Sequence, residues 1–392
     1  MSRRQSLLKQ LGIKYPILQS PMAGVSTPEM AQSVTNAGGL GAIPLSTINF
    51  LQPDSIAKTE WLMENFFNGL TSSTNHHAST PVNFNFFSHT VEQPPTPDEV
   101  NNWKSMYAKL GIPTTTFNQI STFENGNVSF NEFCADGEAT RRIRDILEAY
   151  KPAIISFHFG IPKLPQELLT QLEKNNNSNT LIFVTATSIA EVERIVSSEY
   201  TIHGIILQGY EAGGHRGNFA HSSKYDENMP SLTLLQRTLA YFSGSPTRPY
   251  LVVAGGIMDS NDIKVFLQAG ADAVQLGTAF LASQESTTMK FFSNVNQPKL
   301  AAQATVMVDA VSGKPARAVR TQFINEVIQH SSTVGPLPPY GYAYGAYKKL
   351  KGLNVDTSLD LGFYLAGMNY YRLDRELCST KQVMEKLISG LE

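Results

Sequence analysis

Cysteine is scarce in this sequence, with only Cys134 and Cys378 among 392 residues. Two cysteines and no CxxC motif exclude a disulfide framework, and they indicate ordinary thiols in a reducing compartment. Charge is also scarce: charged residues make up 16% of the chain and the net charge is −2. Such a chain has no basic stripe for nucleic acid, so we expect no nucleic-acid partner. The composition predicts a globular, cytoplasmic protein.

Long apolar runs are missing as well. No run of about 18 apolar residues occurs, so we expect no transmembrane helix and no membrane partner. The first residues lack a continuous apolar segment of signal-peptide length. The sequence is compatible with a homodimer but contains nothing that indicates one.

Short apolar segments alternate with helical stretches from residue 17 to residue 283. This alternation predicts parallel strands joined by crossover helices. Eight such strands can close into a (β/α)8 TIM barrel, the α/β fold that we predict, although periodicity alone also allows an open doubly wound sheet. The predicted strands are Ile17–Ser20, Gly41–Leu45, Val82–Phe87, Ala153–Phe157, Leu181–Thr185, Gly204–Gln208, Tyr250–Ala254 and Ala273–Leu276.

The chain is longer than a minimal barrel of roughly 250 residues, so additional segments must be placed. The predicted barrel covers residues 1–283, with insertions near 51–80 and 91–150. Residues 284–336 lack a recognisable βα unit and are predicted to form a smaller, mainly helical second domain. Residues 337–392 are predicted to return to the barrel and to form C-terminal helices.

The segment after the sixth predicted strand, LQGYEAGGHRGNF, is the most informative in the chain. Its glycines permit backbone shapes that other residues cannot adopt, and they keep bulky neighbours away from His215. Histidine exchanges protons near neutral pH, so His215 is the candidate general base. His158, at the end of the fourth predicted strand, is the next candidate. No histidine or carboxylate stands beside His215 at a metal-binding spacing, so we predict no metal.

Glycine turns also follow the seventh and eighth predicted strands, in VVAGGIMD and VQLGTAF. Backbone N–H groups at such turns bind phosphate, and barrels often hold a phosphate at these two loops. The AGG sequence is not a GxGxxG fingerprint, which argues against a Rossmann nicotinamide site. In the third predicted strand, Asn83 and Asn85 each offer an amide donor and acceptor that suit the polar edge of a flavin.

Taken together, these motifs resemble the nitronate monooxygenase family, once called 2-nitropropane dioxygenases. The most specific part of the resemblance is QGYEAGGHRG, and the GGH motif with the later tyrosine segment is similar to class I of the family. The resemblance extends over Tyr15–Leu45, Pro81–Phe87, Val184–Gly217, Leu251–Ala282 and Pro339–Lys348.

This resemblance implies an FMN enzyme on a (β/α)8 barrel with a small extra domain. It implies that the partners are small molecules: alkyl nitronates of the propionate 3-nitronate type are oxidised by O2 to a carbonyl compound and nitrite. Whether neutral nitroalkanes are also used stays open. The insertions are longer than expected for compact members of the family, so the substrate size is open too.

The resemblance also assigns residues. His215 corresponds to the catalytic base of the family, and Tyr340, Tyr344 and Lys348 correspond to a segment that lines the substrate mouth. The flavin contacts that it implies are Met22, Ala23, Gly24, Asn85, Gln208, Gly213, Gly214, Gly255, Gly256, Gln275, Leu276, Gly277 and Thr278.

Two alternative functions stay open at this point. A flavin-dependent enoyl-acyl carrier protein reductase shares the barrel and a similar glycine–histidine loop, but it would need NAD(P)H and a groove for an acyl chain. The second alternative is a flavin-binding or degenerate barrel without enzymatic activity, because one barrel fold hosts many functions.

Overall fold

The eight predicted strands form one parallel sheet, with the order β1-β9-β8-β6-β5-β4-β3-β2. The N–H of Leu40 donates to the carbonyl of Ile17, and the N–H of Gln19 donates to the carbonyl of Leu40, so the sheet closes on itself ahead of β2. The fold is therefore the predicted TIM barrel and not an open doubly wound sheet. The computed structural model describes residues 2–71, 79–120, 122–174, 180–220, 226–292, 303–353, 355, 357, 359–374 and 376–391.

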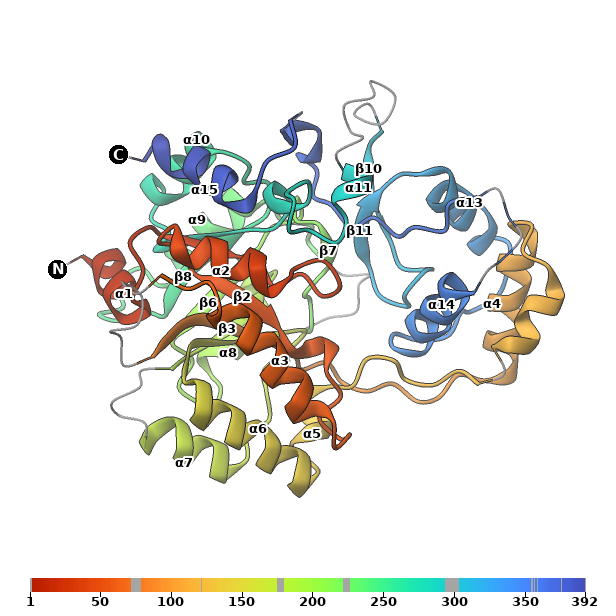
Figure 1. The fold of residues 1–392 in the computed structure, drawn as a ribbon, viewed down its shortest axis with the longest axis horizontal. Helices are drawn as coiled ribbons and strands as arrows, with labels where there is room; N and C mark the ends of the chain where they lie inside the picture. Colours follow the sequence, from red (N-terminus) through yellow and green to blue (C-terminus); the bar gives the residue numbers. More distant parts are fainter. Residues whose placement is uncertain are drawn as a thin grey trace.

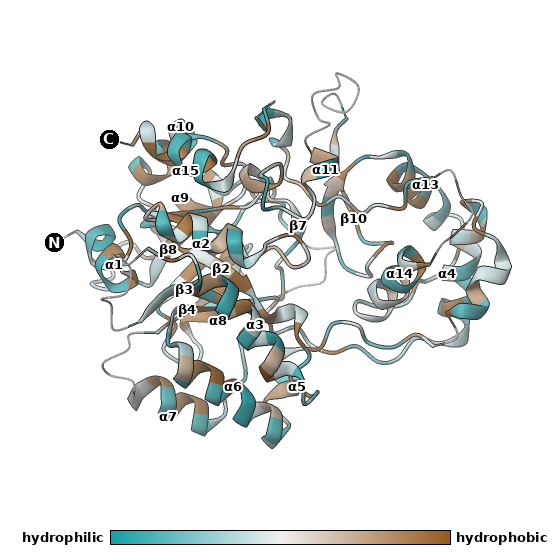
Figure 2. Cartoon of the chain, viewed as in Figure 1, coloured by the Kyte–Doolittle hydropathy of each residue, from teal (hydrophilic) through white to brown (hydrophobic). Residues whose placement is uncertain are grey.

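The strands are buried almost throughout, as expected for parallel strands with a core on one side and helices on the other. In Figure 2 the barrel strands are largely brown, whereas the helices around them carry teal residues. The strands are β1 (Ile17–Gln19), β2 (Gly41–Pro44), β3 (Thr80–Phe87), β4 (Pro152–His158), β5 (Leu181–Ala186), β6 (Gly204–Gln208), β8 (Tyr250–Ala254) and β9 (Ala273–Leu276).

Helices cover the outside of the barrel (Figure 1). Several begin at a capping side chain. In α2, for example, the hydroxyl of Thr27 accepts a hydrogen bond from the N–H of Met30, and Pro28 is the first helical residue. The barrel helices are α1 (Arg3–Leu11), α2 (Pro28–Asn36), α3 (Ser55–Phe67), α5 (Phe130–Phe133), α6 (Gly137–Tyr150), α7 (Gln166–Lys174), α8 (Ile189–Val196), α9 (Ser231–Tyr241), α10 (Ser260–Gln268) and α15 (Thr380–Ser389). Shorter turns are η1 (Leu45–Thr47), η5 (Thr278–Phe280), α11 (Met289–Phe292) and η7 (Tyr370–Arg372).

A second unit lies beside the barrel, on the right in Figure 1. Its centre is a three-stranded antiparallel sheet in the order β10-β11-β7, formed by Thr305–Val308, Ala316–Val319 and Gly214–His215. The sheet is joined by helices α4 (Pro97–Lys109), α13 (Gln322–Ser331) and α14 (Tyr342–Gly352) and by the short turn η3 (Thr114–Gln119).

Side-chain packing in this unit joins segments that are far apart in the sequence. Trp103 and Tyr107 of α4 share one hydrophobic cluster with Phe323 of α13 and Tyr347 of α14. Two extended segments, orange in Figure 1, run between the barrel and α4 and carry the chain out and back.

The predicted domain limits do not separate these packed groups. The predicted insertion 91–150 contains α4 and the predicted return 337–392 contains α14, and both helices pack against residues from 305 to 331. Within 337–392, α15 does contact the barrel helices α2 and α10. Parts of two other predicted segments, 72–78 and 293–302, lie outside the described residues.

Among the described residues, no helix combines the length and the apolar character needed to cross a membrane.

The two tryptophans of the chain give a matched test of the second hydrophobic cluster. Trp103 is 0% exposed and Trp61, on α3, is 58% exposed. We expect Trp103→Ala to lower the free energy of unfolding by about 3–5 kcal/mol, because it leaves a large cavity. Trp61→Ala should change it by less than about 0.5 kcal/mol. Urea denaturation followed by circular dichroism measures both, and equal losses would contradict this account of the packing.

Candidate functional site

A cavity of about 340 Å³ lies at the carboxyl ends of the barrel strands, where the second unit covers the barrel. Its volume is within the range of small-molecule sites. Loops after β1, β6, β8 and β9 form one side, and the segment from Tyr340 to Lys348 forms another. The residues that the family resemblance assigned all line it: Met22, Ala23, Gly24, Asn85, Gln208, Gly213, Gly214, His215, Gly255, Gly256, Gln275, Leu276, Gly277, Thr278, Tyr340, Tyr344 and Lys348.

The glycine turns after β8 and β9 offer backbone donors. Gly255 and Gly256 have φ angles of 116° and 77°, a region that favours glycine. Among the described residues, no acceptor takes the N–H of Gly256 or of Thr278. The side chain of Asn369 donates to the carbonyl of Gly256 (2.7 Å), and the N–H of Gly367 donates to Oγ1 of Thr278 (2.9 Å). Two braced turns with free N–H groups suit an oxyanion such as phosphate.

Amide acceptors lie on the barrel side of the cavity. Nδ2 of Asn85 donates to Oγ and to the carbonyl of Ser156 (3.0 and 3.2 Å), whereas its Oδ1 is buried and no described residue donates to it. Oε1 of Gln275 is likewise buried without a partner among the described residues. An unpaired buried acceptor costs about 1–3 kcal/mol, so a ligand with N–H groups along its edge fits here. Asn83 is also buried, but it does not line the cavity.

His215 lies at the junction of the barrel and the second unit. It belongs to β7, where it pairs with Ala316 of β11, and its ring lies 5.5 Å, centroid to centroid, from the rings of Tyr340 and Tyr344. Burial, aided by the nearby charges of Lys314 and Lys348, lowers the pKa of His215 to about 3. The imidazole is therefore neutral at pH 7, the form that a general base requires.

His158 supports this loop. Its Nδ1 contacts Oγ1 of Thr185 and its Nε2 contacts the carbonyl of His215, both at 3.2 Å. Nε2 of Gln208 donates to the same carbonyl (3.1 Å). Burial lowers the pKa of His158 to about 4. Because the protein engages both of its ring nitrogens, His158 fits a supporting role better than that of a base.

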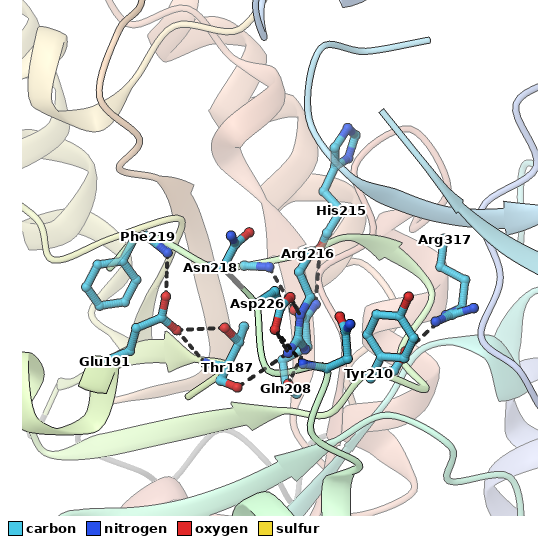
Figure 3. Close-up of polar contacts among 12 residues, drawn as sticks. Thr187, Glu191, Gln208, Tyr210, His215, Arg216, Asn218, Phe219, Asp226 and Arg317 are labelled. Atoms are coloured by element: carbon cyan, nitrogen blue, oxygen red, sulfur yellow. Dashed lines mark hydrogen bonds and ion pairs between the residues drawn. The ribbon is translucent and has the colours of Figure 1, made fainter. Parts of the chain in front are cut away.

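Arg216 anchors the loop from the opposite side. Figure 3 shows its guanidinium pointing away from the imidazole of His215, as alternation along a strand requires. Nε and Nη2 donate to the carboxylate of Asp226 (2.6 and 3.0 Å), and Nη1 donates to the carbonyl of Gln208 (2.6 Å). Both charged groups are buried and hydrogen-bonded, so the ion pair fixes one loop conformation.

Glu191 of α8 makes a second anchor (Figure 3). Its Oε2 accepts from the N–H and the hydroxyl of Thr187 (2.6 and 2.8 Å), and its Oε1 accepts from the N–H groups of Phe219 and Ala220. One buried carboxylate thus ties the loop after β5 to the loop after β6, which carries His215.

Sequence reasoning missed the contribution of the long excursion between β3 and β4. Gly126 and Asn127 line the cavity, and their oxygens accept from Nζ of Lys348 (3.3 and 3.2 Å). The close approach depends on glycine in α14: a Cβ at Gly345 would lie 2.7 Å from the carbonyl of Glu124. The glycine spacing in GYAYG was the available signal. The cavity residues from the C-terminal part, Leu365, Gly367 and Asn369, were also missed.

Comparisons with known proteins agree with one another. A sequence model of the family described as nitronate monooxygenase matches residues 4–390. A Saccharomyces cerevisiae protein, whose name assigns it provisionally to this family, is 38% identical over 98% of this chain and 92% of its own length. The nitronate monooxygenase of Pseudomonas aeruginosa is 32% identical over 87% of this chain and 86% of its own length.

Solved structures show the same fold. Nitroalkane oxidase from Streptomyces ansochromogenes superposes with a TM-score of 0.74 at 25% identity, covering 98% of this chain and 97% of that one. FabK from Thermotoga maritima superposes with a TM-score of 0.62 at 20% identity, covering 98% and 95%. The second likeness concerns the fold alone.

The Glu191 anchor can be tested with a matched pair on one helix. We expect Glu191→Gln to lower the free energy of unfolding by about 3 kcal/mol, because the new NH2 group faces donors that lose their acceptor. Glu193→Gln, on the exposed side of α8, should change it by less than about 0.5 kcal/mol. Denaturation curves of both variants provide the measurement, and indistinguishable curves would refute the anchor.

Three histidines with lowered pKa values predict a loss of stability in acid. Burial lowers the pKa of His89 and of His158 to about 4 and that of His215 to about 3, from 6.5. The unfolded chain therefore binds more protons than the folded one as the pH falls below about 6.5, which favours unfolding until the pH passes the lowered pKa values. At about pH 5 this difference in proton binding lowers the free energy of unfolding by about 2 kcal/mol for each histidine.

Urea denaturation at pH 7 and at pH 5 measures this effect. Carboxylates contribute to acid destabilisation too, so the informative comparison is with His89→Gln. This variant should lose about 2 kcal/mol less than the wild type between the two pH values. A loss of the same size in both proteins would show that His89 does not contribute.

Proposed function

Because the chain belongs to the nitronate monooxygenase family, and is thus an oxidoreductase, we propose that it oxidises alkyl nitronates of the propionate 3-nitronate type. O2 is the oxidant, FMN is the cofactor, and the products are a carbonyl compound and nitrite. The observation that carries this proposal is that one cavity unites a neutral imidazole at His215 with glycine turns at 255–256 and 277–278. The family model and the similar proteins confirm the family resemblance seen in the sequence, and the reaction itself is our proposal.

The cavity residues fit FMN at both of its ends. The N–H groups of Gly256 and Thr278 would hold the phosphate, and Oδ1 of Asn85 and Oε1 of Gln275 would accept from the polar edge of the ring. Bound FMN would supply the electron transfer between the nitronate and O2.

His215 would act as a base only toward neutral nitroalkanes, the second substrate class that we propose. Its imidazole would take the proton from the carbon next to the nitro group, and the electron pair of the C–H bond would move into that group. A lowered pKa keeps the ring unprotonated at pH 7, and the negative charge of the nitronate product stabilises the imidazolium. A nitronate supplied as substrate is already an anion and needs no base.

The other wall of the cavity would exclude water and attract an anion. The rings of Tyr340 and Tyr344 lie against His215, and Nζ of Lys348 lies 4.7 Å from the ring centroid of Tyr344. The ammonium group of Lys348, which lines the cavity, attracts the anionic nitronate.

The decisive test is the variant His215→Asn. We expect turnover of a neutral nitroalkane to fall by about 10²–10⁴-fold, since the proton acceptor is gone, whereas oxidation of propionate 3-nitronate and bound FMN persist. Oxygen uptake, nitrite release and the visible spectrum of the purified protein are measured. Equal loss on both substrates would contradict the base role.

The same preparation separates the alternative functions. Rapid anaerobic bleaching of the flavin absorbance by NADH would favour an enoyl-acyl carrier protein reductase. A colourless protein, or a coloured one indifferent to nitronates, would favour a barrel without this activity.

A further inference from the structure

Ser312 joins the imidazole of His215 to the second unit. It lies in the turn between β10 and β11 and is 0% exposed. Its Oγ lies 3.0 Å from Nε2 of His215 and donates to the carbonyl of Lys314 at 2.9 Å. A serine hydroxyl has one proton to donate and lone pairs to accept with, whereas a carbonyl only accepts. Both contacts are hydrogen bonds only if the proton on the imidazole is carried by Nε2.

We propose that Ser312 is a positioning residue, which holds the single ring proton of neutral His215 on Nε2 and so leaves Nδ1 as the basic nitrogen. No described residue makes a hydrogen bond to Nδ1, and His215 lines the cavity. Ser312 is not among the residues that line the cavity, so the hydroxyl that fixes the tautomer is not part of the ligand-facing wall. The catalytic consequence of this inference rests on the proposed function, but the tautomer itself does not.

The backbone holds Ser312 in place relative to the imidazole. The N–H groups of Ser312 and Gly313 both donate to the carbonyl of Asp309 (3.1 and 2.7 Å). Gly313 has a φ of 82°, and a Cβ there would lie 2.4 Å from the backbone nitrogen of Tyr340, so the turn accepts only glycine. The pairing of His215 with Ala316 then fixes the distance between ring and hydroxyl.

Proton transfer needs no rearrangement in this geometry. The C–H bond of the nitroalkane breaks, its electron pair enters the nitro group to form the nitronate, and the proton binds Nδ1. The resulting imidazolium carries N–H on both nitrogens, and Nε2 continues to donate to Ser312. The opposite tautomer would present an N–H to the substrate carbon and could not accept the proton.

The direct experiment is ¹⁵N NMR of the histidine rings in the FMN-loaded protein, since the chemical shifts of the two ring nitrogens identify the protonated one. The wild type is expected to show His215 protonated on Nε2 at pH 7, and Ser312→Ala to show loss of this preference. A wild-type ring protonated on Nδ1 overturns the inference, and this result does not depend on how well the variant folds.

Kinetics supply the second readout. Ser312→Ala should lower kcat for a neutral nitroalkane by about 10–100-fold, the usual size of an effect from a group that orients a reactive one. Oxidation of propionate 3-nitronate should change by less than about threefold, because the base is not used there. Equal losses on both substrates, or none on either, overturn the positioning role.

Ser283→Ala is the matched control, since it removes a buried hydroxyl that donates to a carbonyl, that of Phe280, without contact with His215. In Ser283→Ala, the tautomer of His215 and the ratio of nitroalkane to nitronate oxidation should match those of the wild type. A change equal to that in Ser312→Ala overturns the inference. If the wild type oxidises no nitronate and yet shows the Ser312-dependent tautomer, the proposed function fails and the inference about Ser312 stands.

Discussion

The pairing of β7 with β11 holds the imidazole of His215 where the barrel meets the second unit. It consists of two residue pairs, Gly214 with Arg317 and His215 with Ala316, and the N–H of Arg216 extends it by donating to the carbonyl of Pro315. Without this pairing the ring would lose its fixed distance to Ser312 and to Tyr340. The candidate chemistry therefore depends on the short antiparallel sheet of the second unit, which is separate from the barrel sheet.

Two buried charged side chains, Arg216 and Glu191, stabilise the loop that contains β7. The guanidinium of Arg216 and the carboxylate of Glu191 are both buried, and their hydrogen bonds to described residues reach the loops after β5 and β6 or the carbonyl of Gln208. Removing two charges from water is costly, and such a network is favourable only when its hydrogen bonds are complete. Its benefit is a single loop conformation, which a reactive side chain needs in order to meet its substrate at a fixed distance.

The cavity itself works against stability. It contains unpaired acceptors on Asn85 and Gln275, the glycines 255 and 256 with positive φ, and two histidines, His158 and His215, whose pKa values are lowered. Two separate hydrophobic clusters, one in the barrel and one around Trp103, offset these costs. Sites prepared for a ligand commonly combine local strain with a stable surrounding scaffold.

The local sequence was enough to predict the barrel, because the pattern of each strand and each helix can be recognised within a window of about ten residues. The apolar runs from Ile17 to Leu276 and the glycine turns between them identified the strands and the loops at their carboxyl ends. They also identified the candidate ligand-binding residues on those loops. Periodicity and turn chemistry are properties of neighbouring residues, so they can be read without knowledge of the fold.

Tertiary structure alone decided what lies opposite those loops. The contacts of Asn127 with Lys348, of Trp103 with the helices after residue 320 and of Ser312 with His215 join residues separated by roughly a hundred positions or more. No local pattern encodes such pairs, because each side chain by itself is an ordinary polar or apolar residue. The sequence could thus name the candidate base, but only the folded chain shows which nitrogen of His215 lies beside a hydroxyl, that of Ser312, 97 residues away.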